Sequence, residues 1–280
     1  MKLILICSFL LTAFYAKSQD NKFKIADSLF KENKYFEAAI YAEKILFESE
    51  NIEDKNLAVE LKIECLKQQK KFKELNEFIT DCYNYNPNEL LRKKLVYEEI
   101  LANYFTKNYL QTINLCNFLL PKKNSEKHLI DIVKIISYNQ LQEWHIADSL
   151  WKIFTINMQI KDTLVNNYYS HLPKFKNEKK AATLSAFLPG TGQLYAGKPL
   201  EGLASFIFQA GSVWAGFAWW NRGYKLAAIA LAGSFWTSFN DGGKRRAKKL
   251  VQQYNEKRAF DFNETLNKTI LNTTKHYFKD

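Results

Sequence analysis

The chain has 280 residues, of which only 10 are glycine and 5 are proline, so it lacks the turn residues that an all-β fold of many short strands needs. This length predicts two structural units, and the composition predicts that both are helical. The net charge of +11 does not indicate nucleic-acid binding, because the densest basic clusters, 174–180 and 244–249, flank the most apolar part of the chain.

The first 18 residues have the pattern of a secretory signal peptide. Lys2 precedes an apolar run from Leu3 to Tyr15, and the small residues Ala16 and Ser18 occupy the positions before a predicted cleavage site. The alternative is an uncleaved anchor, but the run is shorter than the about 20 residues that cross a bilayer. We therefore expect cleavage after Ser18.

Four copies of one pattern follow between residues 22 and 157. An aromatic residue opens the second helix of each predicted pair, and the spacings between these anchors are 37, 37 and 35 residues: Tyr35, Phe72, Tyr109 and Trp144. Residues three, seven and ten places after each anchor are mostly apolar or small, which places them on one face of a helix. Residues nine and seven places before each anchor are also apolar or small, so the two helices of a pair can pack closely.

The first copy, Tyr35–Leu46, resembles the second helix of a tetratricopeptide repeat, and the spacings are near that family's period of about 34 residues. The resemblance implies a solenoid of helical hairpins over residues 19–173, whose first helices line a groove that binds a protein or peptide partner. The glycine and the tryptophan of the family's first helix are missing, so these repeats are degenerate. The alternative is a stack that binds no ligand and serves as a spacer.

No pattern in the chain indicates an enzyme, a metal centre or a cofactor site. Cys65, Cys82 and Cys116 fall on packing positions of the repeats, which predicts buried hydrophobic side chains rather than ligands. The four histidines are dispersed without metal-ligand spacing, and no nucleophile-elbow motif occurs. We therefore predict a protein without catalytic, cofactor-binding or metal-binding residues, and without a small-molecule substrate.

Two apolar runs, Leu203–Trp220 and Leu226–Phe239, predict a helical hairpin in the last third of the chain. The first run has 18 residues without a charge, enough to propose a membrane-spanning helix, whereas the 14 residues of the second alone favour a re-entrant or interfacial segment. Trp219, Trp220 and Trp236 lie near the ends of these runs, as in the aromatic belts of membrane proteins. We therefore expect a transmembrane hairpin in a lipid bilayer. The alternative is a buried hairpin packed on the repeats.

A glycine-rich segment precedes the hairpin. Gly192–Lys198 contains part of the phosphate-binding loop of nucleotide-binding proteins. Pro199 stands where a serine or threonine must hold magnesium, so we exclude a nucleotide-binding loop of this type. The segment resembles instead the Leu-Pro-Gly-x-Gly-Gln-x-Tyr-x-Gly signature of two-transmembrane-helix domains in exported bacterial proteins of unknown function. The residues that carry this resemblance are Leu188, Pro189, Gly190, Gly192, Gln193, Tyr195, Gly197 and Gly202. The resemblance implies a two-helix membrane domain over residues 174–262, followed by a polar tail over residues 263–280.

Together these patterns predict an all-α protein, in which a tetratricopeptide-like solenoid precedes a C-terminal apolar transmembrane hairpin. We expect an exported scaffold of a bacterial cell envelope, attached to the inner membrane with its repeat domain in the periplasm. The alternative function is an accessory factor for envelope assembly or membrane-protein insertion, in which the hairpin is the functional part. The side on which the C-terminus lies stays open, because a hairpin after a cleaved signal leaves both basic clusters outside, against the positive-inside preference.

Overall fold

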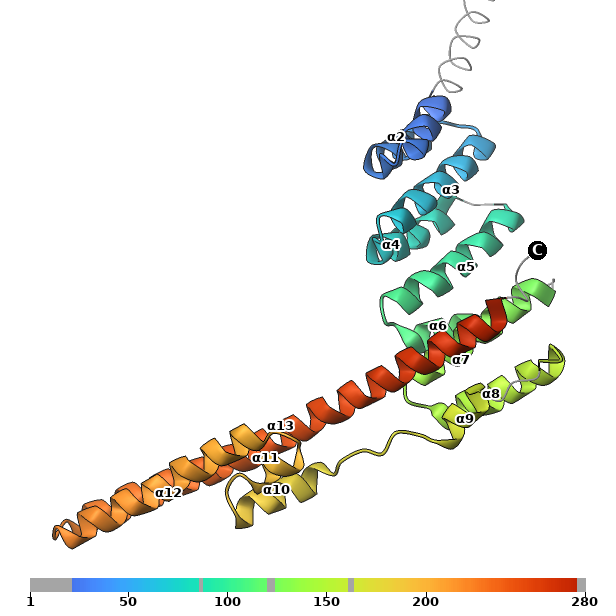
Figure 1. The fold of residues 1–280 in the computed structure, drawn as a ribbon. Coiled ribbons are helices and arrows are strands. Elements are labelled where there is room, and N and C mark those ends of the chain that lie inside the picture. The colour runs from blue at the N-terminus through green and yellow to red at the C-terminus, as the bar shows by residue number, and fades with distance from the viewer. Residues whose placement is uncertain (1–21, 86–87, 120–123, 161–163, 276–280) are drawn as a thin grey trace, which may run out of the picture. The chain divides into compact units, whose positions relative to one another are not determined.

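The structure, a computed structural model, describes residues 22–85, 88–119, 124–160 and 164–275 (Figure 1). Every regular element in these ranges is a helix, so the predicted all-α class is confirmed. The chain divides into two compact units, Met1–Lys161 and Asp162–Asp280. The sequence pattern placed this division after residue 173. It lies earlier in the structure because helix α9, Leu164–Ser170, packs against the last helix of the second unit.

The first unit is a stack of antiparallel helices, each packed against its neighbours in sequence (Figure 1). Its first helix is described over residues 22–31. The helices that follow are α2 (Tyr35–Glu48), α3 (Ile52–Gln68), α4 (Phe72–Cys82), the 3₁₀ turn η1 (Tyr83–Tyr85), α5 (Glu89–Phe105), α6 (Tyr109–Phe118), α7 (Asn124–Gln140) and α8 (Trp144–Asn157). Helices α2, α4, α6 and α8 therefore begin at the four aromatic anchors.

The helix faces predicted from the repeat register are buried in this unit. Three places after the anchors stand Ala38, Leu75, Thr112 and Ala147, each 0% exposed. Nine places before them stand Ala26, Ile63, Ile100 and Ile135, which are also buried. Two positions depart from this pattern. Seven places before the first anchor, Ser28 is exposed, whereas its counterparts Cys65, Ala102 and Ser137 are buried. Ten places after the third anchor, Leu119 is only partly buried.

The two helices of each pair are joined by the same left-handed turn. The residue two places before each anchor has φ between 57° and 64°: Asn33, Lys70, Lys107 and Gln142. The next backbone amide then donates to a carbonyl five residues back, as Lys71 N does to Leu66 O. This is a Schellman helix end, in which glycine or asparagine usually takes the left-handed position. Only Asn33 follows that preference, so composition gave no sign of these turns.

The second unit is built around a long antiparallel pair, α12 (Pro199–Asn221) and α13 (Lys225–Thr274). Two short helices, α10 (Glu178–Phe187) and α11 (Thr191–Tyr195), pack against the base of this pair. Gly223, with φ of 90°, makes the turn between α12 and α13. Helix α13 runs without a break through Gly242 and Gly243 and includes residues 263–274 of the predicted polar tail.

The prediction of a transmembrane hairpin is wrong. Among the described residues, no helix combines the length and the hydropathy that crossing a membrane requires, so the predicted inner-membrane location is also unsupported. Helix α12 has 23 residues, but Gln209, two serines, several glycines and three tryptophans lower its mean hydropathy. The apolar start of α13 ends at Asn240 and Asp241. The predicted signal peptide, residues 1–18, lies outside the described residues.

Candidate functional site

The residues of the glycine-rich motif gather around α11, where α10, α11, α12 and α13 pack closely together. Gly190 caps α11 in the left-handed conformation, with φ of 90°. Its backbone lies against Gly202 in the first turn of α12, where a Cβ on Gly190 would come within 2.1 Å of the Gly202 carbonyl oxygen. A Cβ on Gly192 would lie 2.1 Å from the carbonyl oxygen of Ala181 in α10 and 2.8 Å from Cβ of Ala247 in α13. These glycines are therefore required by close packing.

Gln193 links the same helices by hydrogen bonds and is only 1% exposed. Ser185 Oγ donates to Gln193 Oε1 at 2.9 Å and accepts a hydrogen bond from the backbone amide of Gly192 at 3.1 Å. Gln193 Nε2 lies 3.4 Å from the carbonyl oxygen of Gly243, to which it donates. A buried polar group needs such partners, so this network specifies how α10, α11 and α13 meet.

The remaining motif residues shape the two ends of α11. Pro189 follows Leu188, whose extended backbone is the conformation that a following proline favours. At the other end, Tyr195 Oη accepts a hydrogen bond from the backbone amide of Asn177 at 3.1 Å. Gly197, with φ of 88°, turns the chain into α12. The motif thus forms one structural joint, and its side chains contain no nucleophile or metal-ligand set.

Gln209 is a second buried amide, and its role was not predicted from the sequence. It lies in α12 at 1% exposure, and neither of its amide atoms has a hydrogen-bond partner. A Cβ built on Gly243 would lie 3.8 Å from the amide nitrogens of both Gln209 and Gln193. One pattern in the sequence could have indicated that small and polar residues of α12 face α13. Such residues recur every three or four positions along one helix face: Gly202, Ser205, Gln209, Ser212 and Gly216.

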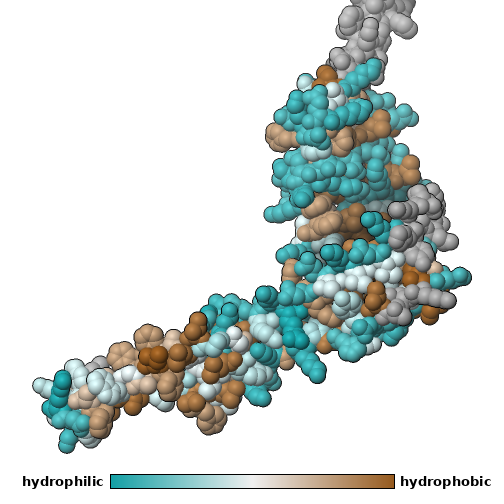
Figure 2. Space-filling view, in the orientation of Figure 1, coloured by the Kyte–Doolittle hydropathy of each residue, from teal (hydrophilic) through white to brown (hydrophobic). Residues whose placement is uncertain are grey.

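The outer surface of the hairpin is apolar along most of its length (Figure 2). Among the described side chains of residues 200–239, sixteen large apolar ones are 38% to 86% exposed: Leu200, Leu203, Phe206, Ile207, Phe208, Val213, Trp214, Phe217, Trp219, Trp220, Tyr224, Leu226, Ile229, Phe235, Trp236 and Phe239. We call this set the hairpin surface. An exposed apolar area of this extent is uncommon on monomeric proteins and is typical of interaction sites.

Two cavities interrupt the hairpin surface. One, of about 370 Å³, is lined by small residues of α12 such as Ser212 and by aromatic rings such as Phe208. The other, of about 580 Å³, lies between Trp220 of α12 and Trp236 of α13. Both are lined by Gly216, whose lack of a side chain leaves room for a group from a partner.

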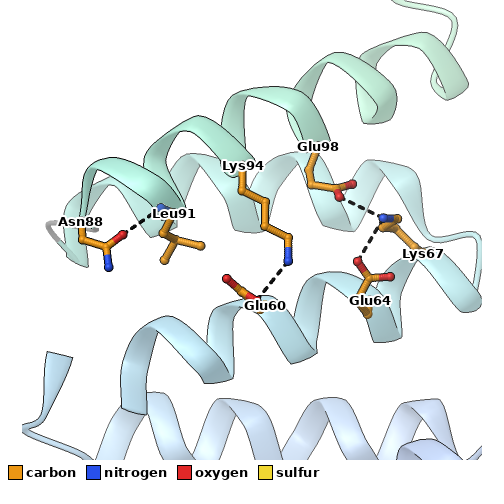
Figure 3. A network of polar contacts seen from close by, with 7 residues as sticks. All are labelled: Glu60, Glu64, Lys67, Asn88, Leu91, Lys94 and Glu98. Carbon is orange, nitrogen blue, oxygen red and sulfur yellow. Dashed lines mark hydrogen bonds and ion pairs between the residues drawn. The ribbon is translucent and has the colours of Figure 1, made fainter. Parts of the chain in front are cut away.

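The first helices of the repeats, which were expected to line a binding groove, are linked to each other by ion pairs (Figure 3). Lys67 of α3 lies 2.9 Å from Glu98 of α5 and 3.1 Å from Glu64. Lys94 of α5 lies 3.0 Å from Glu60 of α3. Burial opposes the charge on Lys67, but hydrogen bonds and charge attraction from both glutamates raise its pKa above the ordinary lysine value. These ion pairs hold α3 against α5, and each of the three glutamates lies within 4 Å of a lysine.

The four repeat anchors are distributed along the stack and form no common site. Tyr35 contacts Phe30 edge to face with ring centroids 5.3 Å apart, and Tyr109 contacts Tyr104 in the same way at 5.6 Å. Phe72 stacks on Phe105 at 4.3 Å. Trp144 is buried at 7% exposure. Each anchor therefore serves local packing between helices.

The three described cysteines are buried free thiols. Burial raises the pKa of Cys65 to about 11 and that of Cys82 and Cys116 to about 12, so their reactive thiolate forms are scarce at neutral pH. In the ranges that the structure describes, no three histidine, cysteine or acidic side chains are grouped as a metal site would require. These thiols act as hydrophobic core groups.

Protein-family models, curated proteins and solved structures were compared with the chain, and none matches it.

Proposed function

We propose that this chain is a non-catalytic scaffold that binds an apolar helix of a partner protein on its hairpin surface. The observation that carries the proposal is the exposure of large apolar side chains on a helix pair whose base is tightly packed. The repeat-like stack of the first unit provides a second folded body on the same chain. A peptide bound on the α3–α5 face is less well supported, because the charges there are already paired.

The area of the hairpin surface is sufficient for a stable complex. A large aromatic side chain buries roughly 150 to 250 Å² when it is fully covered. Sixteen large side chains, each about half exposed, therefore present on the order of 1,500 Å². A standard protein interface buries about 800 Å² on each partner. One face of the hairpin surface thus offers about the apolar area that one partner buries in a standard interface.

The shape of the hairpin surface fits a helix better than an extended chain. Every backbone amide in an α-helix interior is already bonded within the helix, so α12 offers no sheet edge to an added strand. Small residues such as Gly216 leave slots between aromatic ridges, and ridges of a second helix fit such slots.

Charge defines the partner further. No charged residue lies between Leu203 and Trp220, so the partner must present an apolar face there. The turn at the tip carries Arg222 and Lys225 and no acid. We therefore expect an amphipathic helix whose apolar face is followed by acidic residues.

The test uses the full chain and a synthetic amphipathic peptide of about 18 residues, with leucines on one face and glutamates at one end. Titration calorimetry is expected to show saturable binding that weakens at least tenfold in W214A/F217A, because these side chains are 72% and 64% exposed. The control is F47A/F118A in the first unit, where the two side chains are 91% and 82% exposed. It removes as much exposed apolar surface and should bind normally.

Three results would contradict the proposal. The first is absence of saturable peptide binding to the wild-type chain. The second is concentration-dependent dimerisation in sedimentation that W214A/F217A abolishes, which would assign the hairpin surface to a second copy. The third is vesicle binding with the same dependence and without peptide binding, which would assign it to lipid.

A further inference from the structure

A cavity of about 510 Å³ lies beside the motif joint, between the turn that precedes α12 and the middle of α13. Its floor contains Ala196 and Leu250, which are 4% and 3% exposed. The phenol ring of Tyr254 forms part of its wall. This volume is within the range of about 300 to 1,000 Å³ that small-molecule sites occupy.

The charge of this cavity is unbalanced. Three cations line it, Lys198, Lys257 and Arg258, against one carboxylate, Asp261. Elsewhere in the chain many cations find acids within 4 Å, as Arg246 does with Glu201 at 2.7 Å. Within the described ranges, no ion pair joins any of the three lining cations to a carboxylate. The residues that line the cavity therefore carry an excess of two positive charges.

The wall of the cavity is preorganised. Arg258 Nη1 donates to Tyr254 Oη at 2.9 Å, which fixes the guanidinium beside the ring. Behind the ring, Lys176 Nζ lies 3.9 Å from the Tyr254 ring centroid. The backbone of Lys176 is held in turn by two hydrogen bonds with Asn255, each 2.9 Å long. Arg258 and Tyr254 would therefore need little further ordering when a ligand binds.

We propose that this cavity binds a phosphate monoester. A phosphate monoester carries between one and two negative charges near neutral pH, which matches the excess of two, and lysine and arginine are the side chains that bind phosphate. The apolar floor accommodates the carbon part of the ligand. This binding is independent of the helix partner proposed for the hairpin surface, whose residues do not line the cavity.

The test measures binding of glycerol 3-phosphate to the full chain by titration calorimetry at low salt. The double variant K198Q/K257Q removes two lining charges, and neither side chain makes a hydrogen bond or ion pair among the described residues. Arg258 is left in place because it holds Tyr254. The matched control K248Q/K249Q removes the same charge from two exposed residues of α13 that do not line the cavity. We expect at least tenfold weaker binding in the first variant and less than twofold in the second.

Removing a negative charge from the cavity should have the opposite effect on phosphate binding. D261N removes the acid of the cavity and should strengthen phosphate binding severalfold. D241N removes an acid that pairs with Lys244 outside the cavity and should leave it unchanged. Equal effects of D261N and D241N would show a general charge effect and overturn the proposal.

Vesicles containing a lipid with a phosphate-monoester headgroup form the second arm. Vesicle binding that K198Q/K257Q alone weakens, without binding of glycerol 3-phosphate, assigns the cavity to a lipid headgroup. Binding of glycerol 3-phosphate assigns it to a free ligand. If neither probe binds saturably, or if K248Q/K249Q weakens binding as much as K198Q/K257Q, the proposal is wrong.

Discussion

Gly190 and Gly202 pack backbone against backbone, so closely that a methyl group at Gly190 would lie 2.1 Å from the carbonyl oxygen of Gly202. We predict that G190A destabilises the second unit by about 3 kcal/mol or more. The left-handed backbone alone costs alanine about 1 to 2 kcal/mol, and the collision with an unyielding carbonyl adds to it. Thermal unfolding followed by circular dichroism measures the loss.

Gly223 separates these two contributions. It has the same φ of 90°, but no atom lies within 4 Å of an added Cβ. G223A should therefore cost only the conformational part, about 1 to 2 kcal/mol. Equal melting temperatures for G190A and G223A would show that the contact with Gly202 contributes nothing.

Gly192 and Gly211 should respond to alanine with opposite signs. G192A would place a methyl group 2.1 Å from the carbonyl oxygen of Ala181, so we expect loss of the α10–α11 packing. G211A meets no atom within 4 Å and replaces a helical glycine, so it should stabilise α12 by about 0.5 to 1 kcal/mol. Denaturant unfolding of both variants checks the signs, and destabilisation by G211A would contradict the packing described for α12.

Replacing Lys67 should destabilise the first unit more than replacing Lys94. Glu98 is 7% exposed, and K67M leaves its carboxylate without its cation, at a cost of about 2 to 4 kcal/mol. K94M breaks a pair whose side chains are 39% and 40% exposed, which should cost less than about 1 kcal/mol. Urea unfolding measures both. Adding E98Q to K67M should recover much of the loss, and failure to do so would show that Lys67 acts through packing.

The buried thiols should react slowly with a thiol reagent in the native protein. With a pKa of about 11, Cys65 has on the order of a thousandth of its molecules as thiolate at pH 8. The pKa of each thiol is higher in the folded than in the unfolded protein, so folding favours the protonated thiol. This contribution to the free energy of unfolding is complete below the unfolded-state pKa of about 8.5. It is lost as the pH rises toward the folded-state pKa values of about 11 to 12. Rapid labelling at pH 8 without denaturant would contradict this burial.

The sequence was sufficient to predict helices and their buried faces where periodicity is strong. The register set by Tyr35 placed Ala38 and Leu75 on faces that are fully buried in the structure. It could not predict the left-handed turns at Lys70 and Lys107, because lysine has no preference for that conformation. These turns are imposed by the packing of helices on both sides.

The hairpin shows why apolar length alone misled the prediction. The absence of charge from Leu203 to Trp220 favoured a membrane span, but Gln209 and the small residues beside it are polar enough to lower the hydropathy of α12. The motif was recognised as a set, but its geometry was not predictable. Contact between Gly190 and Gly202 depends on how α11 folds back onto α12.

Helix α13 carries part of the hairpin surface near its start and part of the basic cavity near residue 258, with no break between them. At about 1.5 Å per residue, the 33 steps from Lys225 to Arg258 span roughly 50 Å. A molecule bound at the tip and another bound at the cavity would therefore be held at a fixed distance from each other by the helix. Inserting or deleting residues in this rod would change both that spacing and, by about 100° per residue, the direction in which each end faces.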